Sequence, residues 1–472
     1  MPHHDIVIIG SGSGNSLVTE ELADRDIAVI EGGPHFGGTC LNVGCIPTKM
    51  FVLPADRAVE ARSNARLGID TRFEGADWPA IRDRIFGRID PIAADGERYR
   101  REGEETTLYR GHARFTGPRT LVVDVDGEQV EVTADTIVVA AGAHAVIPPV
   151  IAESGVRFHT SDTIMRLPDL PARLLVVGGG FIAAEMSHVF AGLGSEVTVV
   201  VRDSRMLTSN EGLVSELFTE AAARQWDLRT RAEVTSLRQD EGGITAMLSD
   251  GSQVRADEVL VATGRAPSTP GLDCDRAGIE VGDDGSVVVD EFGRTSAEGV
   301  WALGDVSSPY MLKHVANHEA RVVAHNLAHP EDLLPFDHDA VPAAVFSHPQ
   351  IASVGLTSEQ ARAAGHDVCT HVQEYGSTAY GWAMEDTSSR CVLVGDRSTS
   401  SLLGAHLIGP EASVLIQPLI QAMALGTPLV DVARGQYWIH PALTEVVENA
   451  LLGLLEHMRV AETVTESTGT PG

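Results

Sequence analysis

The residues whose types and spacing most clearly indicate chemistry are two cysteines, Cys40 and Cys45, in the stretch CLNVGC. In a regular helix, Cα atoms five residues apart lie roughly 8–9 Å from each other, whereas a disulfide tolerates less than about 7 Å. A bridge therefore requires a distorted turn, which Gly44 and Pro47 would accommodate. A helix N-terminus there would also favour thiolate. A zinc site would need two more ligands nearby, and the sequence offers none. The spacing therefore favours a redox-active disulfide, and the alternative is two unrelated buried cysteines.

A glycine-rich loop follows an apolar, strand-like run near the N-terminus and precedes a predicted helix. Gly10 would permit the tight turn, and Gly12 would let the backbone approach a pyrophosphate at the helix N-terminus. Glu31, at the end of the next predicted strand, is placed to accept hydrogen bonds from ribose hydroxyls. The predicted dinucleotide site comprises Gly10, Gly12, Gly14, Asn15 and Glu31, with Asn15 in place of the usual third glycine.

The same plan returns about 170 residues later, where Gly178 and Gly180 again lie between a predicted strand and a predicted helix. Ala183 keeps the small residue that close packing of helix on strand requires. Arg202 stands where an acidic residue would be expected, and Arg205 follows it. Guanidinium groups suit a ribose 2′-phosphate, so the pattern favours NADPH over NADH. The alternative is a pair of solvated surface arginines.

Two such units imply two dinucleotide-binding folds, and a length of 472 residues suggests about three domains. The formal net charge of −31 argues against a nucleic-acid partner, because phosphate binding needs a basic face. We interpret the acidity mainly as a solubility trait. The N-terminus lacks the basic start of a signal peptide, and no apolar run is long enough to span a bilayer. These features predict a cytoplasmic enzyme with no membrane partner.

The number of cysteines excludes one class of protein, and the scarcity of lysine singles out one residue. Five cysteines in a chain of this length do not form the framework of a secreted disulfide-rich protein. Cys274, Cys369 and Cys391 belong to no motif and are predicted to be packing residues. Lysine is nearly absent, with Lys49 and Lys313 the only two among 35 basic residues. The position of Lys49, just beyond the cysteine pair, is therefore more informative than that of an ordinary lysine.

Together these motifs resemble the pyridine nucleotide–disulfide oxidoreductase family over about residues 5–458. The resemblance implies that the first glycine loop binds FAD and that Asp305, in the stretch TSAEGVWALGD, contacts the ribityl chain. It places Lys49 near flavin N5, with Glu185 as its ion-pair partner beside the nicotinamide. The remaining cofactor contacts that it implies are Gly38, Thr39, Gly142, Gly264 and Gly304.

The resemblance also implies separate roles for the two thiols, with Cys45 facing the flavin and Cys40 meeting the substrate. His440 and Glu445, in the stretch HPALTE, match the acid–base dyad of the family. Imidazole titrates near neutrality and can protonate a departing thiolate. In the family this dyad comes from the other subunit, which implies an obligate homodimer. Phe181 departs from the pattern, because it stands where the family has a gating tyrosine.

The predicted fold class is α/β, with two Rossmann-like dinucleotide-binding domains followed by an α+β dimerisation domain. The FAD-binding domain is expected to comprise residues 1–150 and 272–338, and the NADPH-binding domain residues 151–271. Residues 339–458 would form the interface domain. Residues 459–472 show no apolar periodicity and are predicted to be a disordered tail.

Flavin chemistry does not select the disulfide, so the substrate is predicted from resemblance. Mercuric reductases carry an extra cysteine pair near the C-terminus, and none follows Cys391. Dihydrolipoamide dehydrogenases usually carry an acidic residue where Arg202 stands. Glutathione reductases usually have CVNVGCVPKK where this chain has CLNVGCIPTK. The stretches that most resemble the mycothione reductases of this family are FGRIDPIA, SSPYMLKHVANHEARVV, YGWAMEDT and GQYWIHPALTEVVENALLG.

The expected function is therefore NADPH-dependent reduction of the disulfide mycothione to two mycothiol thiols, through FAD and the Cys40–Cys45 pair. One alternative is a dihydrolipoamide dehydrogenase or a glutathione-type disulfide reductase of the same family. Another is a flavin-binding diaphorase or oxidase whose cysteines are vestigial. The last is a nucleotide-binding sensor without catalytic activity.

Overall fold

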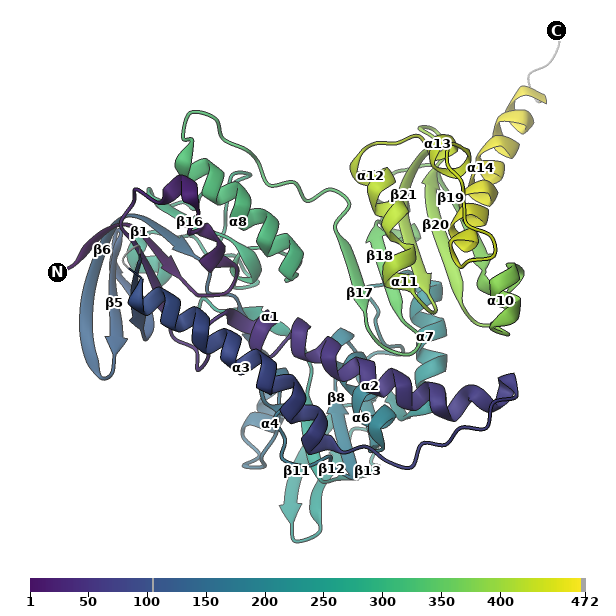
Figure 1. The fold of residues 1–472 in the computed structure, drawn as a ribbon, viewed down its shortest axis with the longest axis horizontal. Helices are drawn as coiled ribbons and strands as arrows, with labels where there is room; N and C mark the ends of the chain where they lie inside the picture. The colour runs from purple at the N-terminus through teal and green to yellow at the C-terminus, as the bar shows by residue number, and fades with distance from the viewer. Residues whose placement is uncertain (104–105, 468–472) are drawn as a thin grey trace.

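The structure is a computed structural model that describes residues 1–103 and 106–467. It contains three units, each built on its own main sheet (Figure 1). In this view the first unit lies at the left, the second at the bottom and the third at the upper right. This arrangement confirms the predicted fold class.

The first unit has a mostly parallel sheet at its centre, extended on one side by an antiparallel hairpin. Strand β2 is buried at all five positions, as expected for a parallel strand that is covered on both faces. β16 (Val300–Ala302) pairs in parallel with β6, so the chain returns to this sheet after the second unit. The spatial order of the other strands is β3 (Thr106–Arg110), β2 (Ile27–Glu31), β1 (His3–Ile9), β6 (Glu128–Val139), β5 (Thr120–Val125) and β4 (His112–Gly117).

The second unit repeats the parallel plan in a smaller sheet of four strands. Along the chain, helix α6 (Phe181–Leu193) connects the first strand to the second, and α7 (Gly212–Gln225) connects the second to the third. The spatial order is β10 (Asp227–Thr230), β9 (Glu196–Val201), β8 (Arg173–Val177) and β14 (Glu258–Val261). A separate antiparallel sheet consists of β11 (Val234–Asp240), β12 (Gly243–Leu248) and β13 (Gln253–Ala256).

The third unit is an antiparallel sheet of five strands with helices packed against it. Its apolar core includes residues from both the sheet and the last helix, such as Leu393 and Leu451. The spatial order is β17 (Pro342–Val345), β18 (Ile351–Gly355), β21 (Ser401–Ile408), β20 (Arg390–Asp396) and β19 (Val368–Glu374). The main helices are α12 (Gln417–Ala424), α13 (Leu429–Arg434) and α14 (Thr444–Ser467).

The connections between the units position the candidate site. β7 (Ala143–Ala145) and β15 (Arg265–Pro267) pair where the chain leaves the first unit and where it returns from the second.

Long helices α2 (Cys45–Ser63) and α3 (Trp78–Glu102) follow the short helix α1 (Gly38–Asn42). Helix α8 (Lys313–Ala328) packs over the first unit (Figure 1). Shorter elements are η3 (Asn64–Leu67), α4 (Pro149–Ala152), α5 (Ser161–Ile164), η4 (Cys274–Ala277), η5 (Gly304–Val306), α9 (Ser358–Ala363), η6 (Tyr375–Ser377), α10 (Ala379–Ala383) and α11 (Ala412–Leu415).

The segment after the first glycine loop differs from the prediction. We expected an amphipathic α-helix, but the structure has two short 3₁₀ segments, η1 (Ser13–Leu17) and η2 (Glu20–Leu22). The reason lies in the composition of residues 13–19, SGNSLVT, in which every residue but the leucine has low helix propensity. The corresponding segment of the second unit, FIAAEMSHVFAGL, contains more of the residues that favour helices and forms α6.

The end of the chain also differs from the prediction. Helix α14 continues to Ser467, although we expected disorder from residue 459 onward. Extending an existing helix by one residue adds one backbone hydrogen bond per residue fixed, so a helix can continue without an apolar face of its own. Residues 468–472 of the predicted tail lie outside the described residues. Of the helices that the structure describes, none combines the length and the apolar character needed to cross a membrane.

Candidate active site

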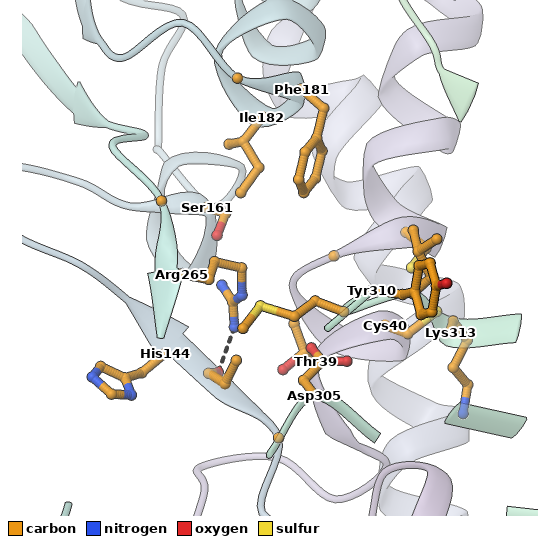
Figure 2. A pocket seen from close by; sticks show the side chains of 18 of the residues that line it. Thr39, Cys40, His144, Ser161, Phe181, Ile182, Arg265, Asp305, Tyr310 and Lys313 are labelled. Atoms are coloured by element: carbon orange, nitrogen blue, oxygen red, sulfur yellow. Dashed lines mark hydrogen bonds between the residues drawn. The ribbon is translucent and has the colours of Figure 1, made fainter. Parts of the chain in front are cut away.

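One cavity is lined by residues of all three units, and both glycine loops lie on its wall. Figure 2 shows Cys40 and Lys313 on one side of the view, with His144 and Arg265 on the other. Most of the site residues predicted from the sequence line this cavity: Gly10, Gly12, Glu31, Gly38, Thr39, Cys40, Cys45, Gly142, Gly178, Gly180, Phe181, Glu185, Arg202, Arg205, Gly264, Gly304 and Asp305. The predicted residues outside the lining are Gly14, Asn15, Lys49, Ala183, His440 and Glu445.

The two cysteines belong to different helices. Cys40 lies in α1, and Cys45 is the first residue of α2. Between them the helix is interrupted at Val43, with φ −143°, and at Gly44, with φ −128° and ψ −119°. This break is the distortion that the spacing of the cysteines requires if they are to form a bridge. Both are free thiols in this structure.

The charges around the two thiols are unequal. The Cys45 thiol donates a hydrogen bond to Cys40, and this bond lowers the pKa of Cys40 to about 7 despite partial burial. The positive charge of Lys313 lowers the pKa of Cys40 further. The same hydrogen bond raises the pKa of Cys45 far above its usual value, and burial and the carboxylate of Asp305 act in the same direction. The pair therefore retains one proton and places its negative charge on Cys40 near neutral pH.

Lys49 and Glu185 meet at a third residue, Phe346, which the sequence did not single out. The Nζ of Lys49 lies 3.8 Å from the centroid of the Phe346 ring, and Glu185 accepts a hydrogen bond of 2.8 Å from the backbone N–H of Phe346. No ion pair within 4.0 Å joins Lys49 to Glu185 in the described chain. Burial raises the pKa of Glu185 to about 7, and burial also lowers the pKa of Lys49. Both groups are therefore partly desolvated but not directly paired.

The first glycine loop is shaped by close backbone contacts. Gly10 has φ +109°, and a Cβ on it would lie 2.3 Å from the carbonyl oxygen of Ala140. Glu31 is buried and accepts a 3.0 Å hydrogen bond from the backbone N–H of Ser11. Asn15 does not face the cavity, because its Oδ1 accepts a 2.9 Å hydrogen bond from Nε of Arg100. The loop therefore offers a narrow backbone cradle of the kind that a pyrophosphate occupies.

The turn that precedes Asp305 is held by two residues that the sequence analysis missed. The neighbouring backbone N–H of Gly304 donates a 2.6 Å hydrogen bond to Glu319, which is buried. His338 lies 2.8 Å from the other oxygen of Glu319. Burial raises the pKa of Asp305. A buried acid with two partners has no signature in sequence spacing, because Glu319 and His338 lie on a helix and a loop that meet only in the fold.

The second glycine loop has similar backbone geometry but a different continuation. Gly178 has φ +132°, and a Cβ on it would lie 2.1 Å from the carbonyl oxygen of Ala262. Ala183 is fully buried within α6, which explains its absence from the cavity wall. Arg202 and Arg205 are both exposed and line the cavity beyond β9. Phe181 is the first residue of α6, lines the cavity and is 49% exposed.

His440 and Glu445 form a pair but do not reach the cysteines of their own chain. Nδ1 of His440 lies 2.8 Å from Oε1 of Glu445, and the His440 side chain is 70% exposed. The neighbouring Tyr437 and Ile439 are also strongly exposed. The imidazole is thus oriented by a carboxylate and exposed on the third unit, outside the lining of the cavity that contains the cysteines.

Comparisons with known proteins agree with this geometry. Residues 4–320 match the pyridine nucleotide-disulphide oxidoreductase family, and residues 341–451 match its dimerisation domain. Mycothione reductase of Mycobacterium tuberculosis is 53% identical over 465 residues, which cover 96% of this chain and 100% of that protein. Mercuric reductase of Streptomyces lividans is 34% identical, with 93% of this chain and 94% of that protein covered.

Solved structures show the same architecture. The flavoprotein disulfide reductase RclA from Escherichia coli superposes with a TM-score of 0.83 at 27% identity, covering 95% of this chain and 99% of that chain. LpdA from Mycobacterium tuberculosis superposes with a TM-score of 0.83 at 26% identity, covering 96% of this chain and 99% of that chain. From its sequence, its cavity and these relatives, the chain belongs to the pyridine nucleotide-disulphide oxidoreductase family and carries the dimerisation domain of that family.

Proposed function

We propose that mycothione is the disulfide that this NADPH-dependent flavoenzyme reduces. The observation that carries the proposal is the 53% identity to a mycothione reductase over nearly the whole of both chains. It is supported by the hydrogen-bonded Cys40 and Cys45 thiols on the wall of a cavity that both glycine loops share. The cofactors of the enzyme are FAD and NADPH.

The residues present fit both cofactors. At the first loop, Gly10 lacks the Cβ that would overlap the Ala140 carbonyl, so the backbone can make the tight turn that a pyrophosphate site needs, and Glu31 lies in the cavity wall at the end of β2. At the second loop, Gly178 and the start of α6 would hold the NADPH pyrophosphate, and Arg202 with Arg205 would hold the 2′-phosphate. When bound, FAD supplies the two-electron transfer that links hydride from NADPH to the cysteine pair.

The substrate half of the reaction is carried by the thiols. Cys40 carries the negative charge of the reduced pair, so Cys40 Sγ attacks one sulfur of the substrate disulfide and forms a mixed disulfide. The first mycothiol leaves as a thiolate and takes a proton. Cys45 then attacks Cys40 Sγ, which releases the second mycothiol and closes the Cys40–Cys45 bridge. Each cycle thus consumes two electrons and cleaves one substrate disulfide.

The proton for the first leaving thiolate comes from His440 of the partner subunit. Within one chain, His440 lies outside the cavity, is exposed and is oriented by Glu445. A homodimer built through the dimerisation domain would place this imidazole against the cysteine pair of the other chain. Glu445 would stabilise the imidazolium in the charged state before it donates.

Lys49 and Glu185 act as positioning residues in this proposal. Both are partly desolvated beside the Phe346 ring, close to the start of α2. Glu185 lines the cavity, whereas Lys49 is outside the lining and contacts the ring of Phe346, which lines it. They would orient the nicotinamide and the flavin ring and balance charge between them. Phe181, at the mouth of the second loop, would cover the nicotinamide with its ring.

The test is a substrate panel of mycothione, glutathione disulfide and lipoamide with NADPH, followed at the nicotinamide absorption band. We expect kcat/KM for mycothione to exceed the other values by at least about 100-fold, the discrimination that a site with dedicated polar contacts achieves. The panel is repeated with NADH to identify the nicotinamide cofactor. Equal or faster reduction of glutathione disulfide or lipoamide would reject mycothione as the substrate and leave the family assignment unaffected.

A further inference from the structure

The first glycine loop lacks one of the usual sources of positive charge for a pyrophosphate. In a dinucleotide fold, the N-terminus of the helix after the loop faces the phosphates, and its aligned peptide dipoles favour the anion. Here the loop is followed by η1, a 3₁₀ segment of five residues. In the second unit the loop is followed by α6, which has 13 residues. A single short turn accumulates little dipole, so the anion at the first loop needs charge from elsewhere.

A lysine from a distant part of the chain lies at this loop. Lys313 is the first residue of α8, and its Nζ donates a 2.8 Å hydrogen bond to Oγ of Ser13 within the loop. The Ser13 hydroxyl in turn donates a 3.2 Å hydrogen bond to Oδ1 of Asn317, one turn further along α8. All three residues line the cavity. The ammonium is therefore fixed at the loop and faces the space that a dinucleotide would occupy.

The electrostatic surroundings of Lys313 suit a bound anion, although its charge also acts on Cys40 and Asp305. A cation at a helix N-terminus is unfavourable, because it faces the positive end of the helix dipole. The first turn of α8 contains no acidic residue and no side-chain cap. In the part of the chain that the structure describes, no carboxylate forms an ion pair with Lys313 within 4.0 Å. A bound pyrophosphate would make this arrangement favourable, because it would accept hydrogen bonds from both the ammonium and the free N–H groups at the N-terminus of α8.

We propose that Lys313 is a phosphate-binding residue of the first glycine loop and supplies to the FAD pyrophosphate the charge that a helix would otherwise provide. This inference rests on the proposed binding of FAD at that loop. Lys313 is one of two lysines in a chain whose other basic residues are arginines. A lysine suits the position because its ammonium is a compact point charge on a flexible stem and fits beside a serine hydroxyl.

The test measures flavin release from the holoenzyme, which does not depend on disulfide turnover. FAD dissociation is followed by the rise of flavin fluorescence on dilution, for wild type, Lys313→Met, Lys313→Arg and Arg321→Met. Arg321 is an exposed cation on the same helix, eight residues further on, roughly 12 Å along its axis. We expect Lys313→Met to release FAD about 10- to 100-fold faster, the effect of losing one charge-assisted hydrogen bond. Lys313→Arg should stay near wild type, and Arg321→Met should match it.

The salt dependence provides a second readout. Raising NaCl from about 0.05 M to about 0.5 M should accelerate FAD release more in wild type than in Lys313→Met. Salt weakens the attraction between the Lys313 ammonium and the phosphate, and the variant lacks this attraction. Equal release rates and equal salt dependence in Lys313→Met and Arg321→Met would overturn the proposal. Wild-type protein that binds no FAD would instead reject the cofactor assignment of the loop.

Two measurements keep the proposal falsifiable if Lys313→Met does not fold. Ser13→Ala removes the hydroxyl that positions the ammonium, and we expect FAD release to accelerate by about three- to tenfold. In ³¹P NMR of the holoenzymes, the pyrophosphate signals of Lys313→Arg should shift from those of wild type, whereas those of Arg321→Met should not. Unshifted signals in Lys313→Arg together with unchanged release from Ser13→Ala would overturn the proposal.

Discussion

The two glycine loops have nearly the same backbone conformation at their first glycine. Gly10 has φ +109° and Gly178 has φ +132°, conformations that favour glycine. A Cβ at either position would lie against a carbonyl oxygen at the end of a neighbouring parallel strand, of Ala140 at 2.3 Å or of Ala262 at 2.1 Å. In both units the absence of a Cβ allows the chain to turn sharply at the carboxyl edge of the sheet, the edge at which folds of this class bind dinucleotides.

The loops differ in the charges placed around that common turn. The second loop leads into α6 and ends near Arg202 and Arg205. The first leads into the 3₁₀ segment η1, has Glu31 at the end of its second strand and receives Lys313 from α8. The two loops therefore share their strand–turn geometry and differ in the charged residues around it.

The comparison predicts that equivalent glycine substitutions have different consequences. Gly10→Ala should abolish FAD binding and with it all activity, because the added Cβ overlaps the Ala140 carbonyl at an unfavourable φ. Gly178→Ala should keep FAD but lose reduction by NADPH. Flavin absorbance per chain and anaerobic stopped-flow reduction measure both effects. Loss of FAD from both variants would show that the two loops do not act separately.

Loss of the attacking thiol should stop disulfide reduction without stopping flavin reduction by NADPH. Cys40→Ser should lower disulfide reduction by at least about 1000-fold, since the attacking thiolate is removed. Reduction of the bound flavin by NADPH should continue. Cys274→Ala, at a buried cysteine of the first unit that lies outside the cavity, is the matched control and should retain turnover. Full turnover in Cys40→Ser would refute the proposed mechanism.

The role of the third unit can be tested by complementation. His440→Ala should slow turnover by about 100- to 10,000-fold, the range for loss of a general acid, while flavin reduction stays fast. Mixed dimers of Cys40→Ser and His440→Ala chains should regain one complete site, because Cys40 of one chain would meet His440 of the other. If the mixed dimers stay inactive while each chain still dimerises, His440 does not act across the interface.

The arginines beyond the second loop should affect the binding of NADPH but not that of NADH or FAD. The double variant Arg202→Ala/Arg205→Ala should raise KM for NADPH by about 10- to 100-fold, because contacts of guanidinium with the 2′-phosphate are lost. KM for NADH and the FAD content should not change. Arg255→Ala, on an exposed strand of the same unit, is the control for a general loss of positive charge. An equal rise in KM for both nucleotides would reject a 2′-phosphate contact.

The smallest expected effect is on the pH dependence of thiol reactivity. The pKa of Cys40 is lowered from 9.0 to about 7, so its thiolate forms as the pH rises through about 7 and is lost by protonation below it. Alkylation of the reduced enzyme by iodoacetamide should therefore increase about tenfold between pH 6 and pH 8. Lys313→Met should move this transition to higher pH. A transition near pH 9 in wild type would contradict the hydrogen-bonded pair.

Local features of the site could be predicted because their causes lie within a few residues. The CLNVGC spacing requires a broken helix, and the structure shows the break at Val43 and Gly44. The glycine loops between strand and turn follow from conformations that favour glycine. The absence of an α-helix after the first loop also has a local cause, the low helix propensity of SGNSLVT. We nevertheless expected a helix there, because the second unit has one in the corresponding position.

Other features depend on segments that meet only in the fold. Phe346 lies between Lys49 and Glu185, although about 160 to 300 positions separate it from them in the sequence. Glu319 supports the turn at Asp305 from a neighbouring helix. No spacing rule identifies such residues, because side-chain contacts between distant segments are set by how helices and sheets pack.

The sequence by itself determined the local backbone of this enzyme at two places: the two glycine turns and the cysteine pair at an interrupted helix. These features follow from steric limits on φ and ψ, which act over a few residues. The tertiary structure decided which charges reach those positions. Lys313 meets Ser13 across 300 positions in the sequence, and His440 is turned outward from the cavity of its own chain. Electrostatic interactions act through space, so only the packed chain determines where they converge.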